Sequence, residues 1–319
     1  MITLSRSGEH VLDHLLAALD LGVANFSVCD VRNGWGVSFE ACSTASLHYC
    51  LAGSGTLVLG DAGRMMLDAH SFVLLPPGVA YRIDVASPTA ARTVKRARVG
   101  NGLVRETAPT VKVGEGAQGV VTACGELSID RSFTVDPFRA LSRPLITRFD
   151  AAGGLRNQFV MLLAESARPG PGSRVLVEAL LKQCFVMALR RHIDDGGVDF
   201  PWAAGLADAR LAAALEAMFE RYASPLSVER LAEEASMSRS AFAAQFAKAF
   251  DQSPMAMLKV VRLRKAAELL ATTTMPVSEV ARAVGLSSRS NFSVAFQRLY
   301  KVDPTRFRHQ SRSTNRFIG

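Results

Sequence analysis

Apolar residues in the C-terminal third of the chain recur at helical spacing, and the pattern occurs twice. Segment 225–254 (PLSVERLAEEASMSRSAFAAQFAKAFDQSP) aligns with segment 275–304 (MPVSEVARAVGLSSRSNFSVAFQRLYKVDP), at a period of about 50 residues. Each copy predicts a short helix, a tight turn and a second helix whose inward face carries phenylalanines four positions apart. Residues 253–274 between them have the spacing of one long amphipathic helix. We therefore predict two helix-turn-helix units joined by a helix.

Residues with particular backbone preferences mark the ends of these helices. Ser227 and Ser238 precede helical patterns and are predicted N-caps. The first turn falls at Ser236, and the second contains Gly285, to which a left-handed conformation is readily available. The turns and the apolar face thus predict the same pair of helices in each copy.

The N-terminal half follows a different pattern. Short alternating or apolar runs, separated by Gly, Pro and Asp, occur at 35–41, 46–53, 55–60, 64–69, 71–78 and 80–85. Dense turn signals between short strands are typical of a β-sandwich or barrel. The fold class that we predict is therefore α+β multidomain, with a β domain over 1–155, a helical segment and linker over 156–204, and an all-α domain over 205–319.

The helical segment carries an apolar stripe along residues 159–197. Its members are Leu176, Leu180, Leu181, Phe185 and Leu189. Such a stripe packs either on the β domain or against a second subunit, and the sequence leaves both open. The Gly, Pro and Asp residues of 194–205 are typical of an interdomain linker.

Charge is distributed unevenly along the chain. The net charge is +8, and residues 206–319 hold 17 Lys and Arg against 10 Asp and Glu, whereas residues 1–205 are nearly balanced with 20 against 19. A cationic C-terminal region attracts polyanions, and neutralisation of DNA phosphates gives salt-dependent affinity. The charge therefore fits double-stranded DNA as a partner.

Composition excludes several classes of protein. No apolar run reaches the length of a membrane span, and the N-terminus lacks the apolar segment of a signal peptide, so we expect a cytoplasmic protein without a membrane partner. The five cysteines are scattered and never form a CxxC pair, which argues against a disulfide framework and a thiolate zinc site. We expect buried thiols in a reducing compartment, and a redox role stays open.

The tandem repeat, together with the closing motif PTRFR (304–308), resembles the DNA-binding domain of AraC/XylS-family regulators over about 205–310. The family often has Arg at the places of Ala244 and Val294, and Gly at the places of Asp251 and Lys301. Without those arginines, recognition of the DNA sequence depends on small polar and apolar side chains, on the remaining cations or on DNA shape. The predicted DNA-binding residues are Arg239, Ser240, Ala244, Lys248, Arg289, Ser290, Ser293, Val294 and Arg298.

Residues 48–81 resemble the cupin-type sensor domain of many such regulators, within a match of about 10–150. Metal-binding cupins carry HxH and a later His after a PxG turn, whereas here His48 is followed by Cys50 and the place after the turn holds Tyr81. Three imidazole or carboxylate ligands cannot be assembled from these places. We therefore expect no metal, no required cofactor and no enzymatic activity, and we expect His48 and His70 to be structural.

Two features suggest an effector site. Trp35 lies at a predicted strand start, and the segment RTVKRAR (92–98) concentrates cations in an otherwise nearly neutral half, as an anion-binding loop would. Arg92 and Arg96 form an RxxxR pair that is similar to the motif by which PilZ domains hold cyclic di-GMP, although the second PilZ element is not intact. The predicted effector set is Arg92, Arg96, Arg32, Trp35 and Tyr81, with cyclic di-GMP or another anion as the candidate effector.

These observations predict an effector-responsive transcription regulator. The resemblance implies an activator that dimerises through 156–195, binds an operator and recruits RNA polymerase. The alternatives are a regulator that senses a sugar, an aromatic compound or a redox signal, a catalytic cupin fused to a DNA-binding domain, and an architectural DNA-binding protein without an effector.

Overall fold

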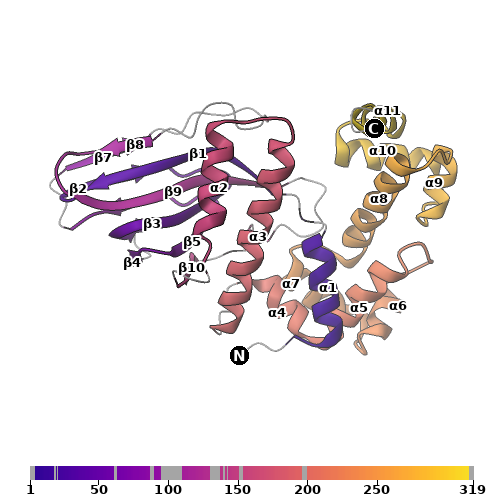
Figure 1. Ribbon diagram of the computed structural model, residues 1–319. Coiled ribbons are helices and arrows are strands. Elements are labelled where there is room, and N and C mark those ends of the chain that lie inside the picture. Colours follow the sequence, from indigo (N-terminus) through magenta and orange to yellow (C-terminus); the bar gives the residue numbers. More distant parts are fainter. Residues whose placement is uncertain are drawn as a thin grey trace. The chain divides into compact units, whose positions relative to one another are not determined.

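A computed structural model describes residues 4–17, 19, 21–60, 63–86, 90–94, 110–129, 137–138, 141, 143–150, 154–195 and 200–315 (Figure 1). They form two compact units. One unit contains the described residues within 19–129 and 137–200, and the other contains those within 4–17 and 201–315. The second unit is discontinuous in sequence, because the first helix of the chain belongs with the C-terminal helices.

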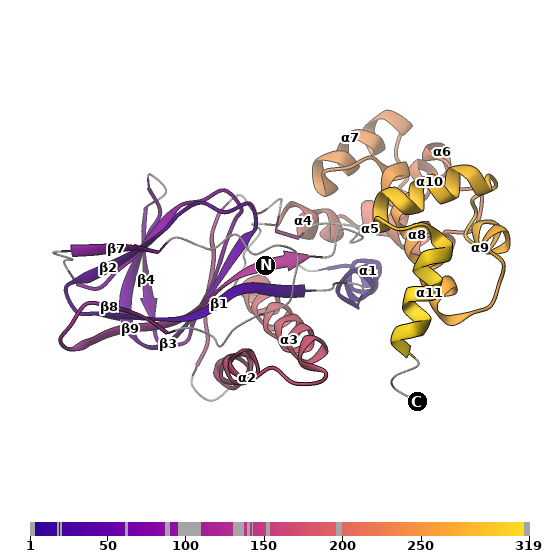
Figure 2. The ribbon, with the colours of Figure 1, turned by 90° about the horizontal axis from the view of Figure 1, so that it is seen from above.

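The first unit is built on a curled, mixed sheet (Figure 2). Its strands are β1 (Leu21–Arg32), β2 (Trp35–Phe39), β3 (Ala45–Val58), β4 (Arg64–Asp68), β5 (Ser71–Leu75), β6 (Tyr81–Asp84), β7 (Ala90–Val94), β8 (Thr110–Val113), β9 (Gln118–Ile129) and β10 (Leu145–Arg148). The main path runs β7-β2-β6-β3-β9-β1-β8, while β4 and β5 pair with β3, and β10 pairs with β5. The pairs β1–β8 and β2–β7 are parallel and the others are antiparallel. The predicted β-barrel or sandwich is confirmed.

Two of the predicted runs are a single strand. Residues 46–53 and 55–60 both fall largely within β3, which continues through Gly53 with a φ of 76°. A Cβ at Gly53 would collide with the carbonyl oxygen of Gly119 on the neighbouring strand β9, so only glycine permits this close approach. The glycine that looked like a turn between strands is therefore a bend within one.

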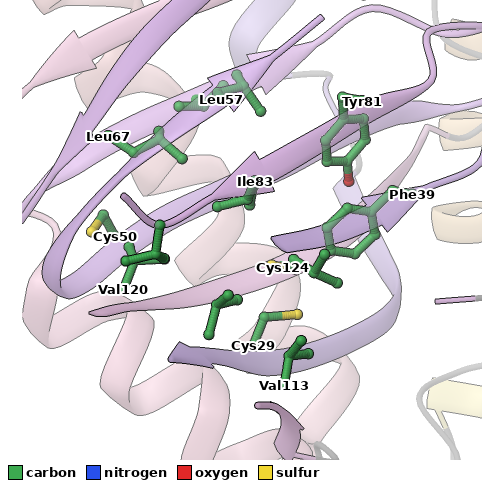
Figure 3. Close-up of a cluster of buried hydrophobic side chains, with 14 of the residues drawn as sticks. Cys29, Phe39, Cys50, Leu57, Leu67, Tyr81, Ile83, Val113, Val120 and Cys124 are labelled. Atoms are coloured by element: carbon green, nitrogen blue, oxygen red, sulfur yellow. The ribbon is translucent and has the colours of Figure 1, made fainter. Parts of the chain in front are cut away.

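The core of this unit lies inside the curl of the sheet (Figure 3). Side chains at alternate positions of β1, β6 and β9 point into it, as the period of two in a strand requires, whereas on β3 the alternation is interrupted by the irregularity between Cys50 and Ala52. Three thiols, of Cys29, Cys50 and Cys124, belong to this cluster beside aliphatic side chains. Within the part of the chain that the structure describes, these cysteines behave as small apolar residues.

The helices α2 (Arg156–Ala167) and α3 (Ser173–Asp194) belong to the same unit and pack on its strands β1 and β10 (Figure 1). The ring of Phe159 on α2 stacks on Tyr49 of β3 with centroids 4.5 Å apart. The predicted apolar stripe is mostly buried here, because Leu180, Leu181, Phe185 and Leu189 are all at most 6% exposed. Of the two alternatives for this stripe, the structure shows packing on the β domain.

The second unit is all helical (Figure 1). It contains α1 (Arg6–Ala17), α4 (Pro201–Ala207), α5 (Ala209–Glu220), α6 (Val228–Glu234), α7 (Arg239–Phe250), α8 (Pro254–Thr272), α9 (Val277–Ala283), α10 (Arg289–Tyr300) and α11 (Pro304–Asn315). The two predicted helix-turn-helix units are α6–α7 and α9–α10, and α8 is the predicted connecting helix. Part of the expected linker 194–205 is helical, since α4 begins at Pro201.

Helix α1 packs on α5 and α4 of this unit, whereas the sequence placed residues 1–17 in the sensor domain. Val11 and Leu15 are buried on its inner face. Gly8 is buried as well, and a Cβ at this position would run into the carbonyl oxygen of Leu206 on α4. The amphipathic pattern predicts a helix here, but it does not tell which partner the apolar face covers.

The turn and cap predictions are confirmed. The side chains of Ser227 and Ser238 each accept a hydrogen bond from the backbone N–H three residues on, at 3.3 Å. Gly285 has a φ of 76° and Ser236 a φ of 51°, so both turns use the left-handed conformation. Along the described part of the chain, no helix combines the length and apolar character needed to span a bilayer.

Candidate nucleic-acid interface

Each recognition helix is held in place by a row of aromatic rings. On α7, Phe242, Phe246 and Phe250 are buried, with successive centroids 5.5 and 4.7 Å apart. On α10, Phe292 and Phe296 are buried with centroids 5.6 Å apart, and Tyr300 stacks on Phe296 at 4.5 Å. Because one face of each helix is fixed in this way, the opposite face is directed to solvent.

The predicted DNA-binding residues lie on these solvent-directed faces. Among them Ser293 is half-buried and the others are exposed: Arg239, Ser240, Ala244, Lys248, Arg289, Ser290, Val294 and Arg298. Val294 is 48% exposed, so its apolar side chain is open to contact from a partner. An exposed valine between hydroxyl and guanidinium groups is suited to the edge of a base pair that carries a thymine methyl.

The structure adds two amide side chains that the sequence analysis did not include. Gln245 on α7 and Asn291 on α10 are exposed beside the predicted faces. Glutamine and asparagine can form paired hydrogen bonds with adenine in the major groove. Gln245 and Asn291 lie on the flanks of the two helices, whereas the predicted residues lie mainly opposite the buried phenylalanines.

Arg239 forms an ion pair across the first turn. Its Nε lies 2.9 Å from Oε1 of Glu229, the acidic residue in the first turn of α6, and both side chains are largely exposed. Hydrogen bonds to Glu229 from its own backbone N–H and from Ser227, together with the charge of Arg239, lower the pKa of this carboxyl group. Exposed pairs of this kind are weak, so Arg239 can exchange Glu229 for a phosphate or a base.

Two other arginines serve the fold of this unit. Arg262 on α8 is partly buried and donates to the carbonyl oxygens of Tyr222 and Ser224, at 2.7 and 2.8 Å. Burial lowers the pKa of Arg262. Arg308, the last residue of the PTRFR motif, donates to the carbonyl oxygen of Met275 at the start of the second copy. These guanidinium groups hold the segments that precede α6 and α9.

The predicted effector residues are spread over different environments. Arg32 and Trp35 lie at the two sides of the β1–β2 connection, where Arg32 pairs with Asp30 at 2.8 Å and Trp35 is partly buried against the core. Tyr81 is buried inside the curl of the sheet and stacks on Phe39 with centroids 4.7 Å apart (Figure 3). The structure therefore separates Tyr81, which faces the interior, from the other two.

The two arginines of the RxxxR pair are less fully described. The backbone of Arg92 lies in β7, where it is the register partner of Val37 on β2. Trp35 pairs in the same ladder with Ala90, two residues before Arg92. Arg96 lies outside the described residues. The register thus brings Arg92 to the strand that begins with Trp35.

The places of the cupin metal ligands hold a different arrangement. Nδ1 of His48 lies 3.1 Å from the sulfur of Cys124, whose sulfur is also 3.2 Å from the hydroxyl of Thr122. The ring of Tyr81 is edge-on to His48 at 4.9 Å. Among the residues that the structure describes, no three His, Cys, Asp or Glu ligand atoms gather inside the barrel. His48 and Cys124 are therefore packed as part of the core.

Comparison with known proteins agrees with this architecture. Residues 10–194 match the cupin family, and residues 231–310 match the helix-turn-helix domain family. The chain is 34% identical over 157 residues to the HTH-type transcriptional regulator AlkR of Acinetobacter baylyi, which covers 49% of this chain and 51% of that protein. It is 26% identical to the HTH-type transcriptional regulator MtrA of Neisseria gonorrhoeae, over 94% of this chain and 98% of that protein.

Among solved structures, the DNA-binding domain of AdpA in complex with a target DNA is 29% identical, with a TM-score of 0.30 over 36% of this chain and 95% of that domain. The match to AlkR spans only about half of that protein. The cupin match covers more than half of this chain, and the helix-turn-helix match covers both recognition helices. The chain therefore belongs to the AraC family of DNA-binding transcription regulators, with a cupin domain as its N-terminal part.

Proposed function

We propose that this protein is an effector-responsive, sequence-specific transcription activator. The observation that supports it best is the matched pair of recognition helices, each fixed by aromatic residues and each presenting small polar, apolar and cationic side chains to solvent. Since α8 joins the two copies within one unit, both helices can enter successive major-groove segments of one DNA duplex. An effector changes activity only if it binds one state of the protein more tightly than another.

Footprinting on the promoter region next to the gene tests the DNA-binding part. Arg289 begins α10 and is exposed, so Arg289→Ala should weaken specific binding by about 1–3 kcal/mol, roughly 5- to 150-fold. Arg210→Ala is a matched control, because Arg210 is an exposed cation of the same unit that is already paired with Asp208. Equal losses in the two variants would mean that charge alone, and not base contact, accounts for the effect.

Val294 and Ala244 should contribute to the choice of sequence. Val294→Ser replaces the two γ-methyl groups by one smaller hydroxyl and so removes the apolar contact, which should lower discrimination in favour of thymine at one position of the second half of the site. Selection of operators from a random library by both proteins would show this as relaxed preference at that position. An unchanged preference would remove Val294 from the set of base-reading residues.

We further propose that the protein dimerises through the outer face of α2 and α3. Because most of the predicted stripe is buried within its own chain, the candidate surface consists of the apolar side chains that remain exposed, which are Val160, Met161, Val175 and, from the stripe itself, Leu176. A dimer would place two DNA-binding units on two half-sites. In sedimentation equilibrium, Met161→Lys with Val175→Lys should give monomers. Met66→Lys, at a 62% exposed apolar residue of β4, should leave the dimer intact.

An anionic effector, with cyclic di-GMP as the first candidate, is proposed to bind near the end of the sheet where β7 meets β2. The register that puts Arg92 beside the strand starting with Trp35 supports this position, whereas Arg32 is already paired with Asp30. Calorimetric titration with cyclic di-GMP should show binding that Arg92→Ala weakens and that Arg64→Ala, at an exposed cation of β4, does not. Absence of heat at micromolar ligand would reject this nucleotide as the effector.

Activation itself is tested by transcription in vitro with purified RNA polymerase. The protein should raise transcript from a promoter that carries its site, and Arg289→Ala should lower this effect in parallel with DNA affinity. A protein that binds its site yet lowers transcript would be a repressor, and the proposal of an activator would be wrong.

A further inference from the structure

The first helix of the chain is attached to the DNA-binding unit by a polar contact as well as by its apolar face. Helix α1 packs on α5, although the two are separated by about 200 positions in the sequence. Oγ of Ser7 donates a hydrogen bond to Oε2 of Glu216 at 2.6 Å. Nδ1 of His10 lies 3.1 Å from the other carboxylate oxygen of Glu216. Both oxygens of one carboxylate therefore face α1.

A third potential ligand completes this group. The ligand atoms of His10, Glu216 and Glu220 all lie within 4.8 Å of one another. On α5 the two glutamates are four positions apart and project from one side of the helix. His10 comes from the facing helix, so the three side chains converge from two directions. Two carboxylates and one imidazole are a ligand set that zinc and related ions accept.

Ring contacts join the same part of α1 to α5. Next to His10 stands His14, with ring centroids 4.6 Å apart, and its ring stacks on Phe219 of α5 at 5.5 Å.

We propose that His10, Glu216 and Glu220 bind a divalent transition-metal ion of the zinc class and thereby clamp α1 to the DNA-binding unit. Three protein ligands leave a fourth position of a tetrahedral site to water. Imidazole favours zinc, cobalt or nickel over calcium and magnesium, which prefer all-oxygen sites. The site is separate from the barrel positions where cupins hold metal, and it departs from the expectation that this chain binds none.

The clamp has a defined consequence for the protein. Metal that binds only when α1 is docked must stabilise the docked state by mass action. Without metal, His10 and Glu216 are joined only by a partly exposed hydrogen bond, which stabilises docking little. Metal concentration would thus set how firmly the N-terminal helix is held on the unit that carries the recognition helices.

Titration of the untagged, full-length protein with Co²⁺ and Zn²⁺ tests the proposal. After removal of metal by chelation and desalting, Co²⁺ should give a visible absorption band that saturates at one ion per chain and is lost when Zn²⁺ competes. Loss of partners outside the coordination sphere alone reduces metal affinity by about 10–100-fold, so His10→Ala and Glu220→Gln should each weaken binding at least as much. Glu9→Gln, at an exposed carboxylate beside His10, is the matched control and should bind as the parent does.

Hydrogen exchange supplies a second readout. Zn²⁺ should slow exchange of the α1 amides in the parent protein and in Glu9→Gln, but not in Glu220→Gln, whose exposed position allows the fold to persist. Absence of Co²⁺ binding by folded protein would overturn the proposal. So would unchanged affinity in both ligand variants, or an intense near-ultraviolet band from thiolate coordination. DNA binding is measured separately by footprinting, so failure here would leave the proposed regulator unaffected.

Discussion

The two helix-turn-helix units share a turn geometry but use different residues in it, which permits a matched test. In the first turn, the N–H of Ser236 bonds to the carbonyl of Glu233 and that of Met237 to Ala232. In the second, the corresponding bonds run from Gly285 to Arg282 and from Leu286 to Ala281, at nearly the same lengths. Both central residues have positive φ, 51° at Ser236 and 76° at Gly285. Replacing Ser236 by glycine, or Gly285 by serine, therefore changes only the local backbone strain and packing.

The two exchanges should differ in size as well as in sign. A left-handed non-glycine residue is strained by roughly 1–2 kcal/mol, partly offset by about 0.4–1 kcal/mol from the smaller entropy of the unfolded chain. Ser236→Gly should accordingly stabilise the helical unit by at most about 1.5 kcal/mol. Gly285→Ser adds a collision, because its Cβ would lie 2.6 Å from the carbonyl oxygen of Ala223. With about 1–3 kcal/mol for overpacking, we expect a total loss of about 2–4 kcal/mol.

Urea unfolding followed by Trp202 fluorescence measures both changes. Trp202 is 3% exposed on α4 of the helical unit, and Trp35→Phe removes the other tryptophan of the chain. Gly285→Ser should lower the midpoint by roughly 1 M urea or more, given slopes of about 1–3 kcal/mol per molar. If this loss is no larger than the gain from Ser236→Gly, then the close approach of Ala223 is wrong and backbone strain alone governs both turns.

Three further predictions concern strain, pH and thiol reactivity. Lys301 ends α10 with a φ of 63°, so Lys301→Gly should stabilise the helical unit by about 1 kcal/mol in the same urea assay, and no gain would refute strain at this residue. The pKa of His14 is lowered from 6.5, so the unfolded chain takes up the proton first and stability should fall as pH drops below about 6.5. The pKa of Glu216 is also lowered, so stability should fall again as the pH drops below the ordinary carboxyl pKa of 4.5. In a plot of urea midpoint against pH, His14→Gln should remove the decline that begins near pH 6.5 and leave the one that begins near pH 4.5. Burial raises the pKa of Cys50 to about 11 and of Cys184 to about 12, so neither thiol should react with iodoacetamide at pH 8 until urea is added. Mass spectrometry measures the alkylation, and rapid labelling of the folded protein would contradict the burial of these thiols.

The helical unit was largely predictable because its signals are local. Caps at Ser227 and Ser238, left-handed turns at Ser236 and Gly285, and inward phenylalanines each act within one or two helical turns. All of these signals favour the same helix boundaries. The pattern also occurs twice, so each copy supports the prediction made for the other. The exposed faces followed from the buried ones, which is why the predicted DNA-binding residues proved to be at the surface.

Contacts between distant segments were not predictable in the same way. The twelve-residue strands β1 and β9 pair with each other across about 100 positions, and neither shows the punctuated pattern of the runs within 35–85. Tyr81 was predicted as a possible neighbour of Trp35 in the effector set, yet it is buried in the core and stacks on Phe39, its register partner on β2. Register determines which face a strand residue occupies, and the positions of the strands along the chain do not by themselves specify it.

The docking of α1 changes how the two units are connected. Because α1 and α4 both belong to the helical unit, the chain enters the cupin unit after Ala17 and returns at Pro201. While α1 stays on α5, the cupin unit is joined at both of its ends, and a change in it acts on two attachment points. Once α1 leaves α5, only the connection before Pro201 remains, and the accessible separations of the units increase. The strength of the α1–α5 contact is therefore the quantity that decides whether the two units are joined through one connection or through two.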